Sequence, residues 1–103
     1  MNEKLMEAEF GKALAERQTE AEKLGITDKR LAANCEKYGS VSAVKEVLHR
    51  KEASDTFPQL TEAGRVDLTV EALVVEGRFG ALFDDEEVNK CLDNLCAVGY
   101  FQA

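Results

Sequence analysis

The sequence has no tryptophan, a single proline and a single histidine, and its runs of apolar residues are short. A helix that crosses a bilayer needs about 20 consecutive apolar residues, so we expect no membrane span. The opening segment, MNEKLMEAEF, is rich in charge and lacks the apolar stretch that a secretory signal requires. We therefore expect a cytoplasmic protein.

Basic residues are also scarce, and the scarcity is confined to one half of the chain. The 103 residues carry 13 Lys and Arg against 20 Asp and Glu, a formal net charge of −7. Residues 1–51 hold 10 basic and 9 acidic side chains, whereas residues 52–103 hold 3 basic and 11 acidic ones. Duplex binding needs several Lys or Arg to displace counterions, so the acidic half is unsuited to nucleic acid. It is suited instead to a partner protein with a basic surface.

Residues typical of catalytic and metal sites are few. Cys35, Cys91 and Cys96 show no CxxC spacing, and on a helix Cys91 and Cys96 point about 140° apart, so they cannot share a metal ion. His49 is the only imidazole, and no Cys or Ser stands at a suggestive spacing from it. The phosphate-loop, HExxH and GxSxG motifs are absent, and no acid isolated in an apolar stretch stands out as a general acid. We expect reduced cysteines, no metal, no cofactor and no enzymatic activity.

The spacing of apolar residues predicts a long first helix over residues 2–24. Its inner stripe is spaced by three and four residues and consists of Met6, Phe10, Ala13, Arg17, Ala21 and Leu24. The stem of Arg17 can cover apolar surface while its guanidinium reaches water or a carboxylate. Gly25 ends the helix. A thin stripe of this kind packs on the rest of the chain or on a second copy, so a homodimer through this helix is an alternative.

Capping residues predict the remaining helices, and together they indicate one all-α domain over residues 1–103, a compact bundle of five or six mostly short helices. Thr27 caps a helix over 28–38 and Ser40 caps one over 41–51, with Gly39 between them. The inner faces of these two helices are Leu31, Cys35 and Tyr38, and Val41, Val44, Val47 and Leu48.

The second half of the chain predicts three further helices in the same way. A capping box from Thr56 to Gln59 begins a short helix that ends before Gly64, and Asp67 caps a helix that ends at Gly77. Asp84 and Glu87 form the start of the last helix, which ends at Gly99. Two sets of residues are expected to face the core: Phe79, Leu82 and Phe83 before the last helix, and Val88, Cys91, Leu92 and Leu95 within it.

The candidate functional residues are carboxylates of the acidic half. About two of the four acids in the run 84–87 serve the start of the last helix, where the helix dipole favours negative charge. The others are expected to form a negative surface for a basic partner. The predicted partner-binding residues are Glu71, Glu76, Asp84, Asp85, Glu86, Glu87 and Asp93.

Residues 27–51 support a different hypothesis, a small DNA-binding regulator of the helix-turn-helix kind. The stretch has two short helices, Gly39 and Ser40 between them, and a second helix that bears Lys45, His49, Arg50 and Lys51. A recognition helix, however, needs base-reading side chains near its N-terminus, and Ser40 and Ser42 are all that this position offers. A helix–glycine–helix corner is also common in ordinary bundles.

Two resemblances bear on function. The run Gly64-Arg65-Val66-Asp67-Leu68-Thr69-Val70-Glu71-Ala72-Leu73-Val74, followed by Leu82-Phe83 and Glu86-Glu87, resembles a helical segment of uncharacterised bacterial and phage proteins. This resemblance covers residues 57–100 and carries no catalytic motif. The whole chain, small and acidic, resembles in type the anti-CRISPR proteins of phages and mobile elements.

We therefore expect a non-enzymatic inhibitor that binds a basic protein in a bacterial cytoplasm. The resemblance implies a Cas9-type nuclease as the partner, because such nucleases hold nucleic acid in positively charged channels. The alternatives are the DNA-binding regulator and a structural or assembly module.

Overall fold

The computed structural model describes residues 3–50 and 53–100, and every regular element within them is helical. The all-α prediction is therefore confirmed. The elements are α1 (Glu3–Lys23), α2 (Lys29–Tyr38), α3 (Ser40–Arg50), α4 (Phe57–Glu62), η1 (Val66–Leu68), α5 (Val70–Val74), η2 (Gly77–Leu82) and α6 (Asp85–Ala97), where η marks a 3₁₀ helix. The radius of gyration is 12.7 Å, close to the ~13 Å expected of a compact chain of this length. None of the described helices is long and apolar enough to cross a membrane.

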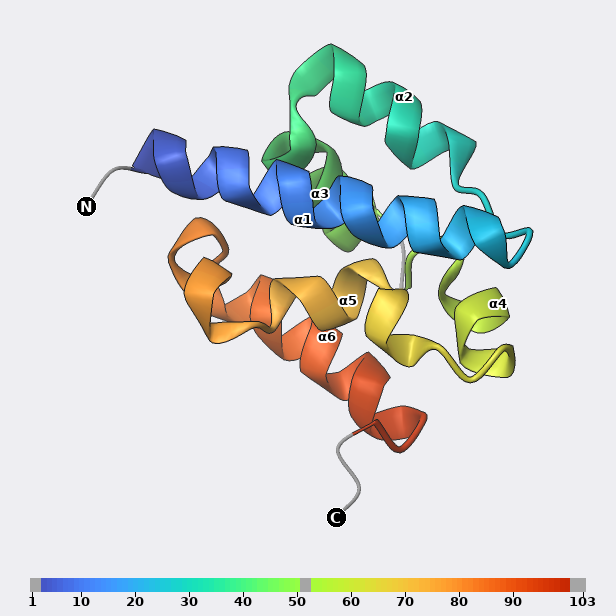
Figure 1. Ribbon diagram of the computed structural model, residues 1–103. Coiled ribbons are helices and arrows are strands. Elements are labelled where there is room, and N and C mark those ends of the chain that lie inside the picture. Colours follow the sequence, from blue (N-terminus) through green and yellow to red (C-terminus); the bar gives the residue numbers. More distant parts are fainter. Residues whose placement is uncertain (1–2, 51–52, 101–103) are drawn as a thin grey trace.

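Helix α1 lies across the middle of the molecule, with α2 on one side of it and α5 and α6 on the other (Figure 1). It contacts α3, α5, η1 and η2. Helix α2 packs on α3, and α6 packs on both α3 and α5. The last helix therefore has one side against the body of the protein, and this arrangement decides which of its residues reach solvent.

The centre of the core is a group of three phenylalanines. Phe10 of α1 is fully buried and meets Phe79 edge to face, with ring centroids 5.1 Å apart, and Phe83 at 5.2 Å. Such aromatic pairs add about 0.5–1.5 kcal/mol beyond the area that they bury. Phe79, Leu82 and Phe83 all face the core, as predicted. Because Phe10 is enclosed by its own chain, it does not offer a seam for a second copy.

Several predicted helix ends are confirmed, and three caps are wrong. Asp28, not Thr27, caps α2, and its side chain accepts a hydrogen bond from the Leu31 N–H at 3.0 Å. Thr69, not Asp67, caps α5, which ends at Val74 before Gly77. Ser40 is the first residue of α3 and not its cap, because the Ala43 N–H already donates to the carbonyl of Gly39. Thr56 occupies the N-cap position of α4 as predicted, but its side chain makes no capping hydrogen bond. Of the predicted helices over 2–24 and 41–51, residues 2 and 51 lie outside the described part of the chain.

The predicted inner faces are right in their centres and wrong at some ends. Leu14 is 3% exposed and belongs to the core, although it lies outside the predicted α1 stripe. Leu24 and Tyr38, both predicted to face inward, are 46% and 54% exposed. Both residues lie at the C-terminal ends of helices, where the chain leaves the body and little surface remains to cover them. On α6, Cys91 and Leu95 are fully buried and Val88 and Leu92 are half-buried.

The corner between α2 and α3 consists of one residue, Gly39, at φ 91°. Only glycine adopts this backbone readily. Gly11 of α1 faces the same corner, and a Cβ at that position would lie 2.9 Å from the Ser40 Oγ. The two helices of the predicted DNA-binding unit are therefore joined more tightly than by the usual turn of three or four residues. Of the two, α3 packs against α1.

Candidate functional site

The structure separates the seven predicted carboxylates into two groups. Glu71, Glu76 and Glu87 are buried or paired with cations of the same chain, whereas Asp84, Asp85, Glu86 and Asp93 are exposed. The seven side chains therefore do not form one negative surface.

Glu71 is fully buried, which corrects the prediction that it extends an exposed acidic surface. Its carboxylate accepts hydrogen bonds from the Ser54 N–H at 2.7 Å and from the Ser54 hydroxyl at 2.8 Å. All five residues of α5 are buried, so this helix has no side on which an acid could reach solvent. Glu71 holds the segment before α4 against α5. Its apolar neighbours in Val-Glu-Ala-Leu-Val-Val are a sequence signal of burial that the prediction of an exposed acid overlooked.

Glu76 is neutralised by two arginines. The Arg17 guanidinium forms an ion pair with one carboxylate oxygen, and Arg78 donates to the other at 2.9 Å. Arg17 also donates to the Asp67 carbonyl at 2.9 Å. The predicted geometry of Arg17, with its stem in the α1 stripe and its guanidinium on a carboxylate, is thus observed, and it removes Glu76 from any net negative surface.

Glu87 is only 3% exposed and joins α6 to α3. It completes the predicted capping box, because its side chain accepts from the Asp84 N–H at 2.9 Å while its own N–H donates to the Asp84 carboxylate at 2.8 Å. Two groups of α3 reach the same carboxylate, Lys45 Nζ at 3.0 Å and His49 Nε2 at 2.7 Å. Burial raises the pKa of Glu87, but the hydrogen bonds from Asp84, Lys45 and His49 outweigh it, so the pKa lies below its usual value.

The group His49, Asp84 and Glu87 is the one set in the described residues that brings three potential metal ligands together, within 4.8 Å of one another. Its donors are already engaged: Asp84 and Glu87 hold the start of α6, and Glu87 also binds the Lys45 ammonium. A cation at this point would face that ammonium and displace the His49 contact. The group is therefore better described as an ion-pair network that fixes α6 to α3.

The exposed group lies on the outer side of α6. Asp85, Glu86 and Asp93 are exposed and form no ion pair within the described part of the chain. Glu86 and Asp93 are seven residues apart, so two helical turns bring them to the same side. Lys90, the one basic residue of α6, donates to the Leu48 carbonyl on α3 instead. We call Asp85, Glu86 and Asp93 the α6 acidic face.

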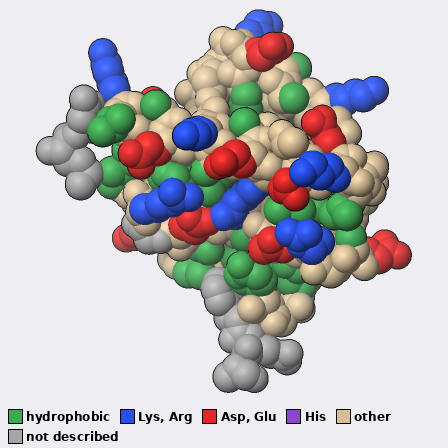
Figure 2. Space-filling model, in the orientation of Figure 1, with side chains coloured by type: hydrophobic (Ala, Val, Ile, Leu, Met, Phe, Trp, Pro, Cys, Tyr) green, Lys and Arg blue, Asp and Glu red, His purple; other side chains and the backbone are tan. Residues whose placement is uncertain are grey.

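On the face that carries α1, positive and negative side chains alternate. Figure 2 shows blue and red groups next to one another across the face that carries α1. Ion pairs such as Lys23–Glu20 at 2.9 Å and Arg65–Asp67 at 3.1 Å account for part of this pattern. The Arg65 hydrogen bond is the main reason why the pKa of Asp67 lies below its usual value. Opposite charges this close largely cancel at a distance, so the α1 side does not present a field of one sign.

The DNA-binding hypothesis finds little geometric support. Helix α3 contacts α1, α2 and α6, which leaves it embedded rather than projecting. Two of its cations are already paired, Lys45 with Glu87 and Arg50 with Glu46 at 3.1 Å. These side chains would have to leave their partners to reach phosphates.

The three cysteines differ in exposure, which follows from their helical positions. Cys35 is half-buried, Cys91 is buried and Cys96 is exposed. Burial raises the pKa of Cys91 to about 12. Cys91 and Cys96 thus lie on opposite sides of α6 and mark its buried and exposed faces.

Comparison of the chain with protein-family models, with curated proteins and with solved structures gives no match.

Proposed function

We propose that the protein is a non-enzymatic binding protein whose α6 acidic face contacts a basic surface of another protein. The observation that carries this proposal is the contrast within the acidic half. Three of the predicted carboxylates are used inside the fold, while Asp85, Glu86 and Asp93 remain exposed and without an ion pair in the described residues. These three carboxylates therefore supply negative charge that a partner protein can contact.

Electrostatics supports this role in two ways. The net charge of −7 favours approach to a cationic protein, and an exposed stripe of one sign orients the encounter. The capping box and the Lys45 and His49 contacts hold α6 in place, so the carboxylates sit on a rigid element. A rigid contact surface loses little conformational entropy on binding.

The partner that we propose is a Cas9-type nuclease, which presents positively charged channels for its guide and target. Carboxylates along one side of a helix could contact the cations that line such a channel and exclude the nucleic acid. The protein would then inhibit cleavage without any chemical step of its own.

Binding and cleavage measurements with a purified, guide-loaded nuclease test this proposal. The key variant is the triple substitution D85N/E86Q/D93N, which removes three charges while preserving side-chain size. We expect the wild-type protein to inhibit cleavage and the variant to bind about tenfold more weakly at low salt. Raising the salt concentration from about 0.05 to about 0.5 M should reduce the difference in affinity between the wild type and the variant, because exposed charges are screened.

A matched control removes the same number of charges from another helix. Glu7, Glu9 and Glu16 are exposed residues of α1, so E7Q/E9Q/E16Q gives the same net charge without touching α6. The proposal predicts that this control binds like the wild type. Equal weakening by both triple variants would show that net charge alone governs binding and would contradict the role of α6. Unimpaired cleavage at large molar excess would overturn the choice of nuclease.

A further inference from the structure

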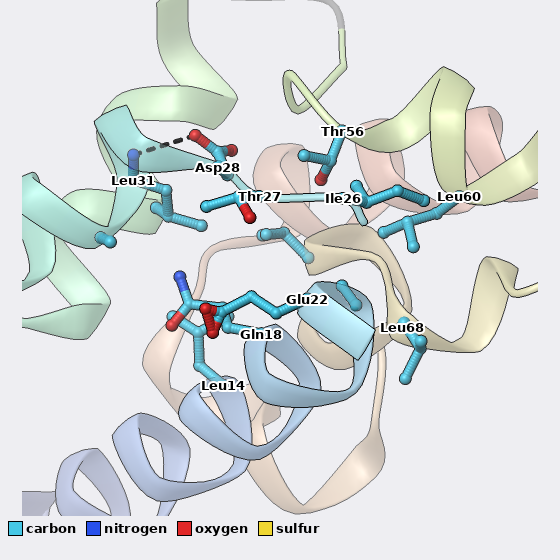
Figure 3. A pocket seen from close by; sticks show the side chains of 13 residues that line it. Leu14, Gln18, Glu22, Ile26, Thr27, Asp28, Leu31, Thr56, Leu60 and Leu68 are labelled. Atoms are coloured by element: carbon cyan, nitrogen blue, oxygen red, sulfur yellow. Dashed lines mark hydrogen bonds between the residues drawn. The ribbon is translucent and has the colours of Figure 1, made fainter. Parts of the chain in front are cut away.

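Helix α2 lies at the edge of the molecule and has one side open to solvent. It packs mainly on α3. Its inward side carries the buried Leu31, which lines a cavity shared with α1 and α4 (Figure 3). Asp28 fixes the start of the helix through the hydrogen bond to the Leu31 N–H, the dashed line in Figure 3. The inner side and the first turn are therefore held in place, while seven of the ten residues of α2 are exposed.

The open side of α2 carries three cations. Lys29, Arg30 and Lys37 are exposed and form no ion pair within the described part of the chain. Glu36 is the one acid of the helix, so α2 has a net positive charge in a protein whose net charge is −7. The Lys37 ammonium lies 5.4 Å from the ring centroid of Tyr38, which is 54% exposed. We call Lys29, Arg30 and Lys37 the α2 basic face.

The α2 basic face and the α6 acidic face have the same spacing of charges. Each consists of two adjacent charged residues and a third that follows seven residues after the second. The third charge is Lys37 on α2 and Asp93 on α6. In both helices it lies about 10–12 Å along the axis from the adjacent pair, and on the same side, because seven residues are close to two turns. The two faces are therefore complementary in sign and equal in spacing.

The two faces belong to helices on opposite sides of α1 (Figure 1). We propose that the α2 basic face binds the α6 acidic face of a second copy of this chain. With the two helices side by side and parallel, the adjacent pairs of charges face each other and Lys37 meets Asp93. Each copy uses a different face, so association is head to tail and forms short linear oligomers. A second copy then competes with any other basic partner for the α6 acidic face.

This interface is expected to be weak and sensitive to salt. Its ion pairs are exposed and contribute little individually, and the net charge of −7 on each copy opposes their approach. At about 0.1 M salt the Debye length is about 10 Å, which screens the repulsion between the two bodies more than the contacting pairs. We expect a dissociation constant on the order of 1 mM under these conditions, and severalfold weaker association at about 1 M salt.

Two variants that each lack one face test the proposal by complementation. K29Q/R30Q/K37Q keeps the α6 acidic face, and D85N/E86Q/D93N keeps the α2 basic face. In ¹⁵N amide NMR of the wild type, we expect concentration-dependent shifts in residues 29–38 and 85–97. Each variant alone should associate at least about tenfold more weakly. In a 1:1 mixture the shifts should return, on residues 29–38 of labelled D85N/E86Q/D93N and on residues 85–97 of labelled K29Q/R30Q/K37Q.

Matched controls take the same charges from α1. Lys4, Lys12 and Lys23 are exposed, so K4Q/K12Q/K23Q has the net charge of the α2 variant, and E7Q/E9Q/E16Q has that of the α6 variant. Both controls should associate like the wild type. A thermal melt shows whether each variant is folded. If a triple variant is unfolded, K37Q and D93N form a second complementary pair, and each should weaken association about two- to fivefold.

The proposal is overturned if wild-type spectra do not change with concentration, or if the 1:1 mixture shows no shifts in the two segments. Equal loss in K29Q/R30Q/K37Q and K4Q/K12Q/K23Q would also overturn it, because net charge would then govern association. A short single-stranded DNA is titrated in parallel. Shifts of residues 29–38 with DNA and none with a second copy would assign the α2 basic face to nucleic acid instead. No nuclease is present, so these outcomes do not depend on the function proposed above.

Discussion

The inward and outward sides of α6 both carry glutamates, but the inward glutamate is paired within the fold and the outward one is exposed to solvent. Glu86 and Glu87 are neighbours in the chain, yet Glu86 is exposed and Glu87 is 3% exposed and bound to Lys45 and His49. One residue step turns a helix by about 100°, which is enough to move a carboxylate from solvent to the interface with α3. The number of acids in a segment therefore says little about its surface charge. What matters is which acids the fold has already paired.

The largest expected difference between the two sides concerns their cysteines. At about pH 8, a pKa of about 12 leaves roughly 1 in 10,000 of the Cys91 side chains as thiolate, and Cys91 is also buried. Cys96 is exposed. We predict that iodoacetamide alkylates Cys96 at least about 100-fold faster than Cys91, as measured by peptide mass spectrometry over time. Comparable rates would mean that α6 is not oriented as described.

The next largest effect is expected at Glu71, the most deeply buried acid. Replacement by alanine leaves the Ser54 N–H and hydroxyl without their partner and opens a cavity beside α5. We predict a loss of about 3 kcal/mol in the free energy of unfolding, measured by urea denaturation. Glu62 of α4 is exposed, so E62A is a matched control and should change stability by less than about 0.5 kcal/mol. A loss below about 1 kcal/mol in E71A would contradict the structural role of this carboxylate.

Glu87 should show an intermediate effect that depends on pH. Its pKa in the folded protein lies below the ordinary value of 4.5, so its ionised form stabilises the fold at neutral pH, and this stabilisation is lost as the pH falls through the folded-state value. We predict that E87Q is about 1–2 kcal/mol less stable than the wild type at pH 7. Urea denaturation at a series of pH values should show the two proteins converging below the ordinary pKa. A difference independent of pH would rule out the proposed ion-pair network.

The outer side of α6 should contribute least to stability. The triple variant D85N/E86Q/D93N removes first-turn charges that favour the helix dipole, but it also removes their mutual repulsion. We predict a change of at most about 0.5–1 kcal/mol in the free energy of unfolding, measured by urea denaturation beside E71A. A loss as large as that of E71A would mean that these carboxylates serve the fold and are not available to a partner.

Local signals predicted much of the fold. The capping box of Asp84 and Glu87 was visible in the sequence and is formed in the structure. Gly25 and Gly39 mark helix ends, and both have positive φ angles. These features depend on a few neighbouring residues, which explains why they could be recognised without knowledge of the tertiary structure.

The errors arose where two local signals competed or where tertiary packing decided. Thr27 and Asp28 are both good capping residues, and the backbone selected Asp28. Asp67 and Thr69 competed in the same way, because η1 occupies the turn around Asp67. The burial of Glu71 depends on Ser54, which is 17 residues away and offers no local signal of contact.

Only part of the candidate site could be predicted from the sequence, because local signals identify exposed acids but not pairs between distant residues. The exposed acids Asp85 and Glu86 could be found from the first turn of a capped helix. The loss of Glu76 to Arg17 could not, because that pair joins residues 59 positions apart. Pairing across the chain has to be known before a surface charge can be assigned.

The most direct test of the central claim is amide NMR of the ¹⁵N-labelled protein during titration with a short polyarginine peptide at low salt. The claim predicts saturable shifts concentrated on residues 85–97, which disappear in D85N/E86Q/D93N and persist in E7Q/E9Q/E16Q. Shifts that spread equally over α1 and α6, or that survive in D85N/E86Q/D93N, would contradict it.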